Sequence, residues 1–285
     1  MSARQIPAPL TIGPREFVWG ERTYVMGVIN VSPDSFAGNG LGDVEVAVAQ
    51  ARRFVEEGAD LLDVGGQSTR PGFEELTLEE ETRRVVPVIE RLVAELPAPV
   101  SVDSYKAPVA RAALEAGAHL MNDIWGFRAS GGCDRGLAEL AVEFGLPAIV
   151  MHNQRGRQFH DVIGDIRAGL EASLAIAEEA GLARERLIVD PGFGFGWTEE
   201  QNLEMLRRLG ELRELGLPVL IGTSRKSTIG AVLGGAPIEA RLWGTAATVA
   251  LAVAAGADIV RVHDVAAMRD VVRVADAVVR GRAGP

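Results

Sequence analysis

Short runs of apolar, often β-branched residues alternate along the chain with longer segments in which apolar residues recur at helical spacing. The nearly continuous apolar character of the short runs is typical of strands buried on both faces of a parallel sheet. The longer segments, such as EVAVAQARRFVEEGA, predict helices between them. Eight strands are therefore predicted, at residues 24–30, 60–66, 99–103, 120–124, 147–152, 187–192, 218–224 and 258–263.

Three of the helical segments end in the same way, as EEGAD, EAGAH and AAGAD. The Gly-Ala pair predicts a helix that ends at a glycine and turns directly into the next strand. Eight strand–helix units in 285 residues predict an α/β fold, the (β/α)8 TIM barrel. We expect a single domain over residues 1–285, with its barrel core at about 24–281. A doubly wound open sheet is the alternative that the pattern leaves open.

Each predicted strand carries a polar or ionisable residue where its apolar run stops. In a (β/α)8 barrel the carboxyl ends of the strands meet at one face and build the active site. A single polar strand end is equally well explained as a cap on the following helix, but a complete rim of them predicts a functional site. These residues are Asn30, Asp63, Asp103, Asn122, Asp123, His152, Asp190, Ser224, Arg225, Lys226, Arg261 and His263.

One part of this rim suits a flat, nitrogen-rich ring. Asp103, Asn122 and Asp190 offer carboxylate and amide oxygens, which can accept from two adjacent N–H donors on the edge of such a ring. The residues expected to pack on the faces of the ring are Ile124, Met151 and Phe195.

The other part of the rim is cationic and suits phosphate oxygens. Arg261 and His263 lie two apart on one strand and so share a face. Arg70 and Arg225, taken singly, are equally compatible with surface ion pairs. The GFGFG stretch after Asp190 is expected to let a ligand approach the backbone closely. The full cationic set is Arg70, Arg225, Lys226, Arg261 and His263.

The chain has 29 basic residues, of which only Lys106 and Lys226 are lysines. Guanidinium is a flat fork, whereas ammonium is a compact point charge. Lys226, in GTSRKS at a strand end, is therefore predicted to need a compact ammonium inside the site. Lys106 is predicted to lie in an exposed first helical turn.

The net charge of −10 argues against a surface that coats nucleic acid or a membrane. Cys133 is the only cysteine, so no intrachain disulfide can form and a reducing compartment is expected. The N-terminus lacks an apolar signal core, and the apolar run WGTAATVALAVAAGA is shorter than the roughly 20 residues that span a bilayer. We therefore expect a cytoplasmic protein that binds neither nucleic acid nor membrane.

An ordered set of motifs between Tyr24 and Val265 resembles the dihydropteroate synthase family. The motifs are INVSPDSF, DVGGQSTRPG, VSVDS, NDI, MHNQ, DPGFGFG, GTSRKS and RVHDV. The resemblance implies a TIM-barrel transferase of folate biosynthesis. It would join 6-hydroxymethyl-7,8-dihydropterin diphosphate to p-aminobenzoate, releasing pyrophosphate and forming 7,8-dihydropteroate.

The resemblance also implies roles for individual residues, and it implies a homodimer. Asn30 would hold the Mg²⁺ that accompanies the diphosphate. The pterin would be bound by Asp103, Asn122, Ile124, Met151, Asp190, Phe195 and Lys226, of which Asp103, Asp190 and Lys226 are expected to be catalytic. The diphosphate would be bound by Arg70, Arg261 and His263. The p-aminobenzoate would lie near Thr69, Pro71, Phe36 and Ser227.

The sequence departs from the family pattern in three places. Gln67 stands where the family usually has Glu, and Trp197 stands where Lys is common. The stretch MHNQRGRQF looks shortened relative to the family's loop. These departures are expected to affect contacts around the site and the segment over the fifth strand, not the core assignment.

Three other functions remain open from the residues. A pterin-binding barrel that presents methyltetrahydrofolate to a corrinoid protein would share Asp103, Asn122 and Asp190. It has no use for a diphosphate cluster, so STRPG, SRKS and RVH argue against it. A Schiff-base aldolase would use Lys226 as nucleophile, but such a lysine normally projects from mid-strand. A barrel with a non-catalytic site is the last alternative.

Overall fold

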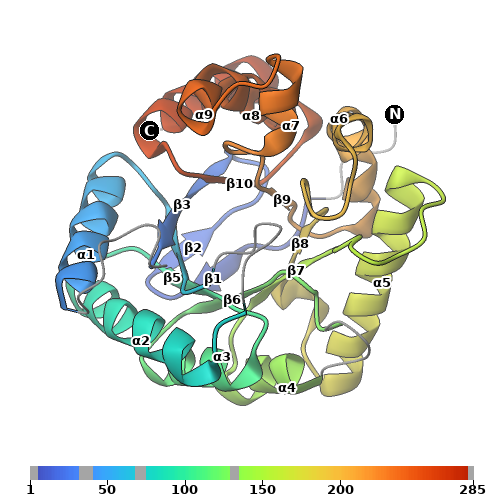
Figure 1. Cartoon of the computed structure of the whole chain (residues 1–285). Coiled ribbons are helices and arrows are strands. Elements are labelled where there is room, and N and C mark those ends of the chain that lie inside the picture. Colours follow the sequence, from blue (N-terminus) through green and yellow to red (C-terminus); the bar gives the residue numbers. More distant parts are fainter. Residues whose placement is uncertain (1–5, 32–40, 68–74, 129–134, 282–285) are drawn as a thin grey trace.

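Eight parallel strands close into a barrel that is surrounded by helices (Figure 1). The computed structural model describes residues 6–31, 41–67, 75–128 and 135–281. The hydrogen-bonded order is β8-β7-β6-β5-β4-β3-β10-β9, and a parallel bridge between Val189 and Val219 joins the two ends of the sheet. The prediction of a (β/α)8 barrel is confirmed, and the open sheet is wrong. The strands are β3 (Tyr24–Asn30), β4 (Leu61–Gly65), β5 (Val100–Asp103), β6 (Leu120–Asp123), β7 (Ala148–Met151), β8 (Leu187–Asp190), β9 (Leu220–Ile221) and β10 (Ile259–Val262).

Helices connect consecutive strands on the outside of the barrel. Their apolar faces pack on the outward residues of the strands in one large core. The α-helices are α1 (Leu41–Glu56), α2 (Leu78–Glu95), α3 (Ala107–Glu115), α4 (Arg135–Phe144), α5 (Val162–Ala180), α6 (Glu199–Arg208), α7 (Ser227–Val232), α8 (Leu242–Ala255) and α9 (Val265–Arg280). Shorter 3-10 helices are η2 (Arg184–Arg186), η3 (Leu209–Leu215) and η4 (Ile238–Arg241).

The three Gly-Ala helix ends are formed as predicted. Gly58, Gly117 and Gly256 have φ angles of 98°, 100° and 97°, a left-handed conformation that an L side chain rarely adopts. Each glycine lets the chain reverse at once into the strand that follows.

Alternation along the strands divides the barrel interior into an apolar layer and a polar layer. Leu61, Leu120 and Ile188 belong to a buried apolar cluster inside the barrel. Successive side chains on a strand point to opposite faces, so the residue two positions further on also points inward. Those next inward residues include Asp63, Asn122 and Asp190. These three residues of the predicted polar rim therefore belong to the upper layer of the barrel interior.

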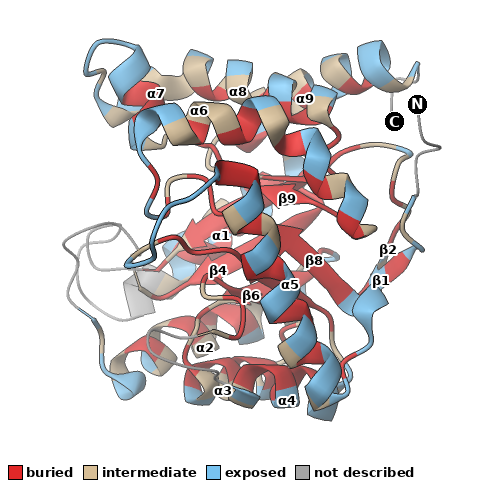
Figure 2. Ribbon diagram, turned by 90° about the vertical axis from the view of Figure 1, so that its right-hand side faces the viewer, coloured by how far each residue is buried: buried red, intermediate tan, exposed pale blue. Residues whose placement is uncertain are grey.

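An N-terminal hairpin, β1 (Leu10–Ile12) paired with β2 (Arg15–Phe17), lies at one end of the barrel (Figure 2). Its apolar residues and Trp19 join the same cluster as the lower interior side chains. The ring of Phe17 lies 4.6 Å from that of Tyr24, at the start of β3. The hairpin therefore closes the amino-terminal end of the barrel. The sequence pattern did not predict it.

Helix α8 lies on the outside of the barrel (Figure 2), and exposed apolar residues form a stripe along it. Trp243 and Leu251 are 79% and 59% exposed, and Val274 and Val278 of α9 are exposed as well. The stretch Ile238–Ala255 is long and apolar enough to cross a membrane by length and composition, with 22% of it buried. One such helix is weak evidence for a span.

Candidate active site

Arg261 is the centre of a polar network at the carboxyl end of the barrel. Its Nε donates to Asp63 Oδ2 at 2.6 Å, and its Nη2 donates to Asp103 Oδ2 at 2.7 Å. Asn122 Nδ2 also donates to Asp63 Oδ2, at 3.0 Å. Four strands, β4, β5, β6 and β10, therefore contribute to one fully connected group. Sequence reasoning placed Asp63 on the rim but gave it no role, although it is the acceptor that joins Arg261 to Asn122.

Asp190 and Lys226 approach the same region from the other side of the barrel. Asp190 is 7% exposed, and its Oδ1 accepts from the backbone N–H of Gly192 at 2.8 Å. Lys226 begins α7 at the N-cap position, and its Nζ lies 4.1 Å from the centroid of the Phe195 ring. In the part of the chain that the structure describes, the Lys226 ammonium contacts the Phe195 ring but forms no hydrogen bond or ion pair, so its donors are available to a ligand.

Burial shifts the ionisation of these groups toward neutrality. It raises the pKa of Asp190 to about 6 and lowers the pKa of Lys226 to about 8. Burial also raises the pKa of Asp103, against the opposing effect of the Arg261 guanidinium. A buried carboxylate with a raised pKa returns to its charged form when a cationic or N–H-donating ring binds beside it. These pKa shifts are therefore typical of a site that binds such a ring.

The three apolar residues predicted to face a ring come together. Ile124, Met151 and Phe195 form one buried cluster, with Tyr105 and Trp125 packed against it. They come from the ends of β6 and β7 and from the connection after β8. The structure thus places a small apolar surface beside the carboxylates and the amide.

The glycines of GFGFG allow close packing of the backbone, but mainly against other residues of the protein. A Cβ at Gly192 would lie 1.9 Å from the carbonyl oxygen of His152, and one at Gly194 would lie 3.0 Å from Lys226 Cδ. Both glycines have positive φ angles, 77° and 82°. This connection is consequently packed tightly against the end of β7 and the stem of Lys226, which fixes where the ammonium lies.

The predicted cationic set is only partly available for phosphate. Arg225 forms an ion pair with Asp264 through two hydrogen bonds, so for this residue the simple ion-pair interpretation is correct. His263 Nδ1 lies 3.0 Å from Ser224 Oγ. Burial, followed by the nearby Arg261 charge, lowers the pKa of His263 to about 3, so it offers a neutral N–H rather than the cation that we expected.

Two of the polar strand ends do not enter the barrel. The Asp123 carboxylate accepts from the backbone N–H groups of Trp125 and Phe127, at 2.8 and 2.6 Å, and so holds the turn after β6. His152 packs against α5, where a Cβ at Gly169 would lie 1.9 Å from its Nδ1. Each follows an inward residue, and alternation therefore turns it outward.

Trp197, where the family commonly has Lys, is buried beneath the connection after β7. Its ring centroid lies 5.7 Å from that of His152 and 6.3 Å from that of Phe159. The side chain therefore supports the MHNQRGRQF segment by packing, where a lysine would supply charge.

The remaining predicted residues are at the rim or outside the described residues. Asn30 ends β3 and is partly buried, and Ser227 is the exposed first residue of α7. Within the described part of the chain, no group of three or more His, Cys, Asp and Glu side chains could hold a metal ion. Four predicted residues lie outside the described residues: Phe36, Thr69, Arg70 and Pro71.

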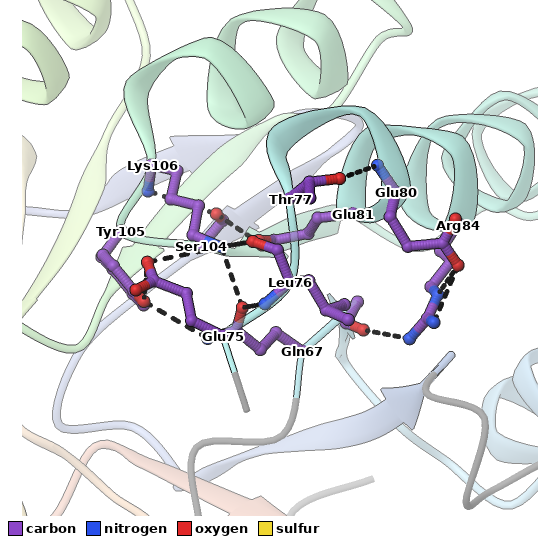
Figure 3. A network of polar contacts seen from close by, with 11 residues as sticks. Gln67, Glu75, Leu76, Thr77, Glu80, Glu81, Arg84, Ser104, Tyr105 and Lys106 are labelled. Atoms are coloured by element: carbon purple, nitrogen blue, oxygen red, sulfur yellow. Dashed lines mark hydrogen bonds and ion pairs between the residues drawn. The ribbon is translucent and has the colours of Figure 1, made fainter. Parts of the chain in front are cut away.

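The prediction for Lys106 is wrong. It is buried, with 8% exposure, because oxygens from the β4–α2 connection and from α2 surround its ammonium (Figure 3). Both lysines of this arginine-rich chain therefore lie where a compact cation is enclosed.

Comparison with known proteins connects this geometry to a family. The family model described as pterin binding enzyme matches residues 26–263. A dihydropteroate synthase from Clostridium beijerinckii is 45% identical over 273 residues, covering 95% of this chain and 100% of that protein. One from Bacillus subtilis is 44% identical over 265 residues, covering 93% and 91%.

Solved structures agree. The dihydropteroate synthase of Clostridium difficile, in the presence of pteroic acid, gives a TM-score of 0.88 at 44% identity, covering 93% of this chain and 99% of that one. The Xanthomonas albilineans enzyme in complex with 7,8-dihydropteroate gives 0.86 at 42%, covering 95% and 98%.

A closed barrel whose carboxyl end gathers carboxylates, an amide and an ammonium around an apolar surface defines a pterin-binding enzyme, in agreement with the match over residues 26–263. Within that class, the chain belongs to the dihydropteroate synthase family.

Proposed function

We propose that the chain condenses 6-hydroxymethyl-7,8-dihydropterin diphosphate with p-aminobenzoate, giving 7,8-dihydropteroate and pyrophosphate. The observation that carries this proposal is the convergence of Asp103, Asn122, Asp190 and Lys226 on one end of the barrel. Support also comes from relatives solved with 4-aminobenzoic acid and with 7,8-dihydropteroate.

In this proposal the pterin occupies the polar upper layer of the barrel. Asp190 and Asn122 accept from the N–H groups on one edge of the ring, while the Lys226 ammonium donates to its carbonyl or ring nitrogen. Ile124, Met151 and Phe195 pack on its faces. This arrangement holds the methylene carbon in a fixed direction, toward the rim where the second substrate arrives.

The reaction breaks the bond between the methylene carbon and the diphosphate oxygen, and it forms a bond from that carbon to the arylamine nitrogen. Positive charge spreads into the pterin ring as the first bond breaks. Asp103 and Asp190 lie where their negative charge stabilises it. Arg261 and the N–H of His263 are proposed to bind the departing diphosphate. The arylamine attacks in its neutral form, so no strong base is needed, and after the carbon–nitrogen bond has formed its nitrogen loses one proton to solvent.

Mg²⁺ fits this site as an ion held mainly by the substrate. Asn30 ends β3 with an amide oxygen, a ligand type that Mg²⁺ accepts, and this ion commonly uses one or two protein ligands plus phosphate oxygens. Asn30 would hold the ion, which would neutralise charge on the pyrophosphate as it leaves.

The direct test mixes the protein, Mg²⁺, the pterin diphosphate and p-aminobenzoate, and measures pyrophosphate and dihydropteroate. Formation of both in equal amounts is expected. A protein that binds the pterin but releases no pyrophosphate would contradict the proposal and favour the corrinoid-partnered class. Trapping of a carbonyl substrate on Lys226 by borohydride would favour the aldolase instead.

Asn30→Ala is expected to weaken the Mg²⁺-dependent binding of pyrophosphate while leaving binding of unphosphorylated pterin within about twofold of the parent, because the amide serves the ion rather than the ring. Paired calorimetric titrations with and without Mg²⁺ measure this. Equal losses for both ligands would place Asn30 in the pterin site or in the fold.

We further propose a cytoplasmic location, which suits a chain with a single cysteine.

We also propose a homodimer whose interface is the outward stripe of apolar residues on α8 and α9. Trp243, Leu251, Val274 and Val278 are highly exposed apolar residues on neighbouring helices. A second copy of the chain presenting the same stripe would cover them.

Trp243→Glu is expected to weaken this dimer by about 2 kcal/mol or more, since a large aromatic at an interface centre is replaced by a charge. Sedimentation velocity over a concentration series measures the change. Val142→Glu, at an exposed apolar position on α4, is the matched control and should leave the dimer intact. A parent protein that stays monomeric throughout would refute the proposal.

A further inference from the structure

Asn202 is a buried amide on α6 that lies between two segments of the candidate active site. It is 2% exposed, and its helix packs beside α7 (Figure 2). Its Oδ1 accepts from the backbone N–H of Gly194 at 2.7 Å, and its Nδ2 donates to Thr228 Oγ1 at 3.1 Å. One side chain therefore joins the connection after β8 to the first turn of α7.

Both segments carry a side chain that is proposed to contact the pterin. Phe195 directly follows Gly194 in the connection. Lys226 is the N-cap residue of α7, two positions before Thr228. A Cβ at Gly194 would lie 3.0 Å from Lys226 Cδ, and the Lys226 ammonium lies 4.1 Å from the centroid of the Phe195 ring. The bonds of Asn202 thus link the two segments where the stem of the lysine passes the ring.

The partners of Asn202 require a side chain that both accepts and donates. Besides its bonds to Gly194 and Thr228, its Nδ2 donates to the backbone carbonyl of Thr198 at 2.9 Å. A carboxylate would place an oxygen against that carbonyl oxygen, and an apolar side chain would leave the buried Gly194 N–H without an acceptor. The bond to Thr198 lies within the beginning of α6, but the other two bonds reach separate elements. Asn202 therefore does more than stabilise its own helix.

We propose that Asn202 is a positioning residue that holds the ring of Phe195 and the ammonium of Lys226 in one arrangement for the pterin. This inference rests on the proposed function, in which both side chains contact the pterin. The start of α7 is also attached to α8, because the backbone N–H of Arg225 donates to Thr245 Oγ1 at 3.1 Å. That bond fixes the lysine relative to the outer helices, whereas Asn202 fixes it relative to the connection after β8.

The test breaks only the bond between α6 and α7, because Asn202→Ala would also leave the buried Gly194 N–H without an acceptor. Thr228→Val keeps the shape of the side chain and removes its hydroxyl, while Asn202 Nδ2 retains the Thr198 carbonyl. We expect the Kd for unphosphorylated pterin, measured by calorimetry, to rise about fivefold, the size typical of one hydrogen bond. Thr228→Ser restores the hydroxyl and should bind the pterin like the parent.

A double-mutant cycle with Lys226→Met separates positioning from a general loss of stability. In that background the ammonium is already absent, so Thr228→Val should change the pterin Kd by less than about twofold. An equal rise in Kd in both backgrounds would overturn the proposal, and so would an unchanged Kd in Thr228→Val alone.

The matched control is Thr198→Ala, which removes the N-cap hydroxyl of α6 but none of the bonds of Asn202. It should lower the melting temperature and leave the pterin Kd unchanged. A Kd raised as far as in Thr228→Val would show that any loosening of α6 weakens binding, against the proposal. A parent protein that binds no pterin would instead refute the proposed function, and this inference with it.

Discussion

Asp190→Ala is expected to abolish measurable turnover. The carboxylate lies inside the barrel at 7% exposure, and its removal takes away the charged acceptor that is proposed to bind the pterin N–H groups together with Asn122. A lost charge-assisted hydrogen bond of this type costs roughly 2–3 kcal/mol in binding, and the loss of negative charge beside the reacting carbon adds to the barrier. Pyrophosphate release and calorimetric pterin binding measure the two effects separately.

The control for Asp190 is Asp123→Asn, another acidic strand end, whose side chain holds a turn outside the barrel. It should retain pterin affinity even where it lowers stability. Unchanged pterin affinity in Asp190→Ala itself would remove Asp190 from the site.

Lys226→Arg is expected to lower the rate about 100-fold or more, equivalent to about 2.7 kcal/mol of transition-state stabilisation. The stem of Lys226 lies against Gly194 and its Nζ lies over Phe195, so a wider fork has no room to direct one short hydrogen bond at the pterin edge. Pyrophosphate release from the parent, Lys226→Arg and Lys226→Met measures the effect, with unfolding curves as the check on folding.

The three-way comparison separates charge from shape. If position 226 needs only a positive charge, arginine should be close to the parent and far above methionine. If it needs a compact ammonium, arginine should be nearly as damaging as methionine. Near-parent activity of Lys226→Arg would therefore refute the compact-ammonium argument. Lys106→Arg would be a neutral control if Lys106 were exposed, as the sequence predicted, but it cannot serve as one because Lys106 is enclosed as well.

The barrel and most of its rim were predictable because they follow from local periodicity. Continuous apolar runs identified all eight strands, and alternation placed Asp63, Asn122 and Asp190 in one inward layer. The same alternation explains two errors. Asp123 and His152 lie one position beyond an inward residue, and a shift of one residue reverses the direction of a side chain.

The features that the sequence did not predict depend on contacts with residues that are distant in sequence. Lys106 precedes a helix and looks exposed locally, yet its burial is created by Gln67, Leu76 and Glu81. The β1–β2 hairpin consists of two three-residue strands, and it is stable only because the open end of the barrel receives its apolar side chains. The local sequence pattern therefore predicts neither the enclosure of Lys106 nor the hairpin at the end of the barrel.

The hairpin that closes the amino-terminal end leaves the barrel with a single mouth. Apolar side chains fill the interior below the polar layer, so substrates and products must pass over the same rim. In the proposed arrangement the pterin lies deeper than p-aminobenzoate and must therefore enter before it. Substrate binding is therefore expected to be ordered, with the pterin diphosphate first and p-aminobenzoate second. Pyrophosphate and the joined product have to leave through the same opening before another pterin can bind.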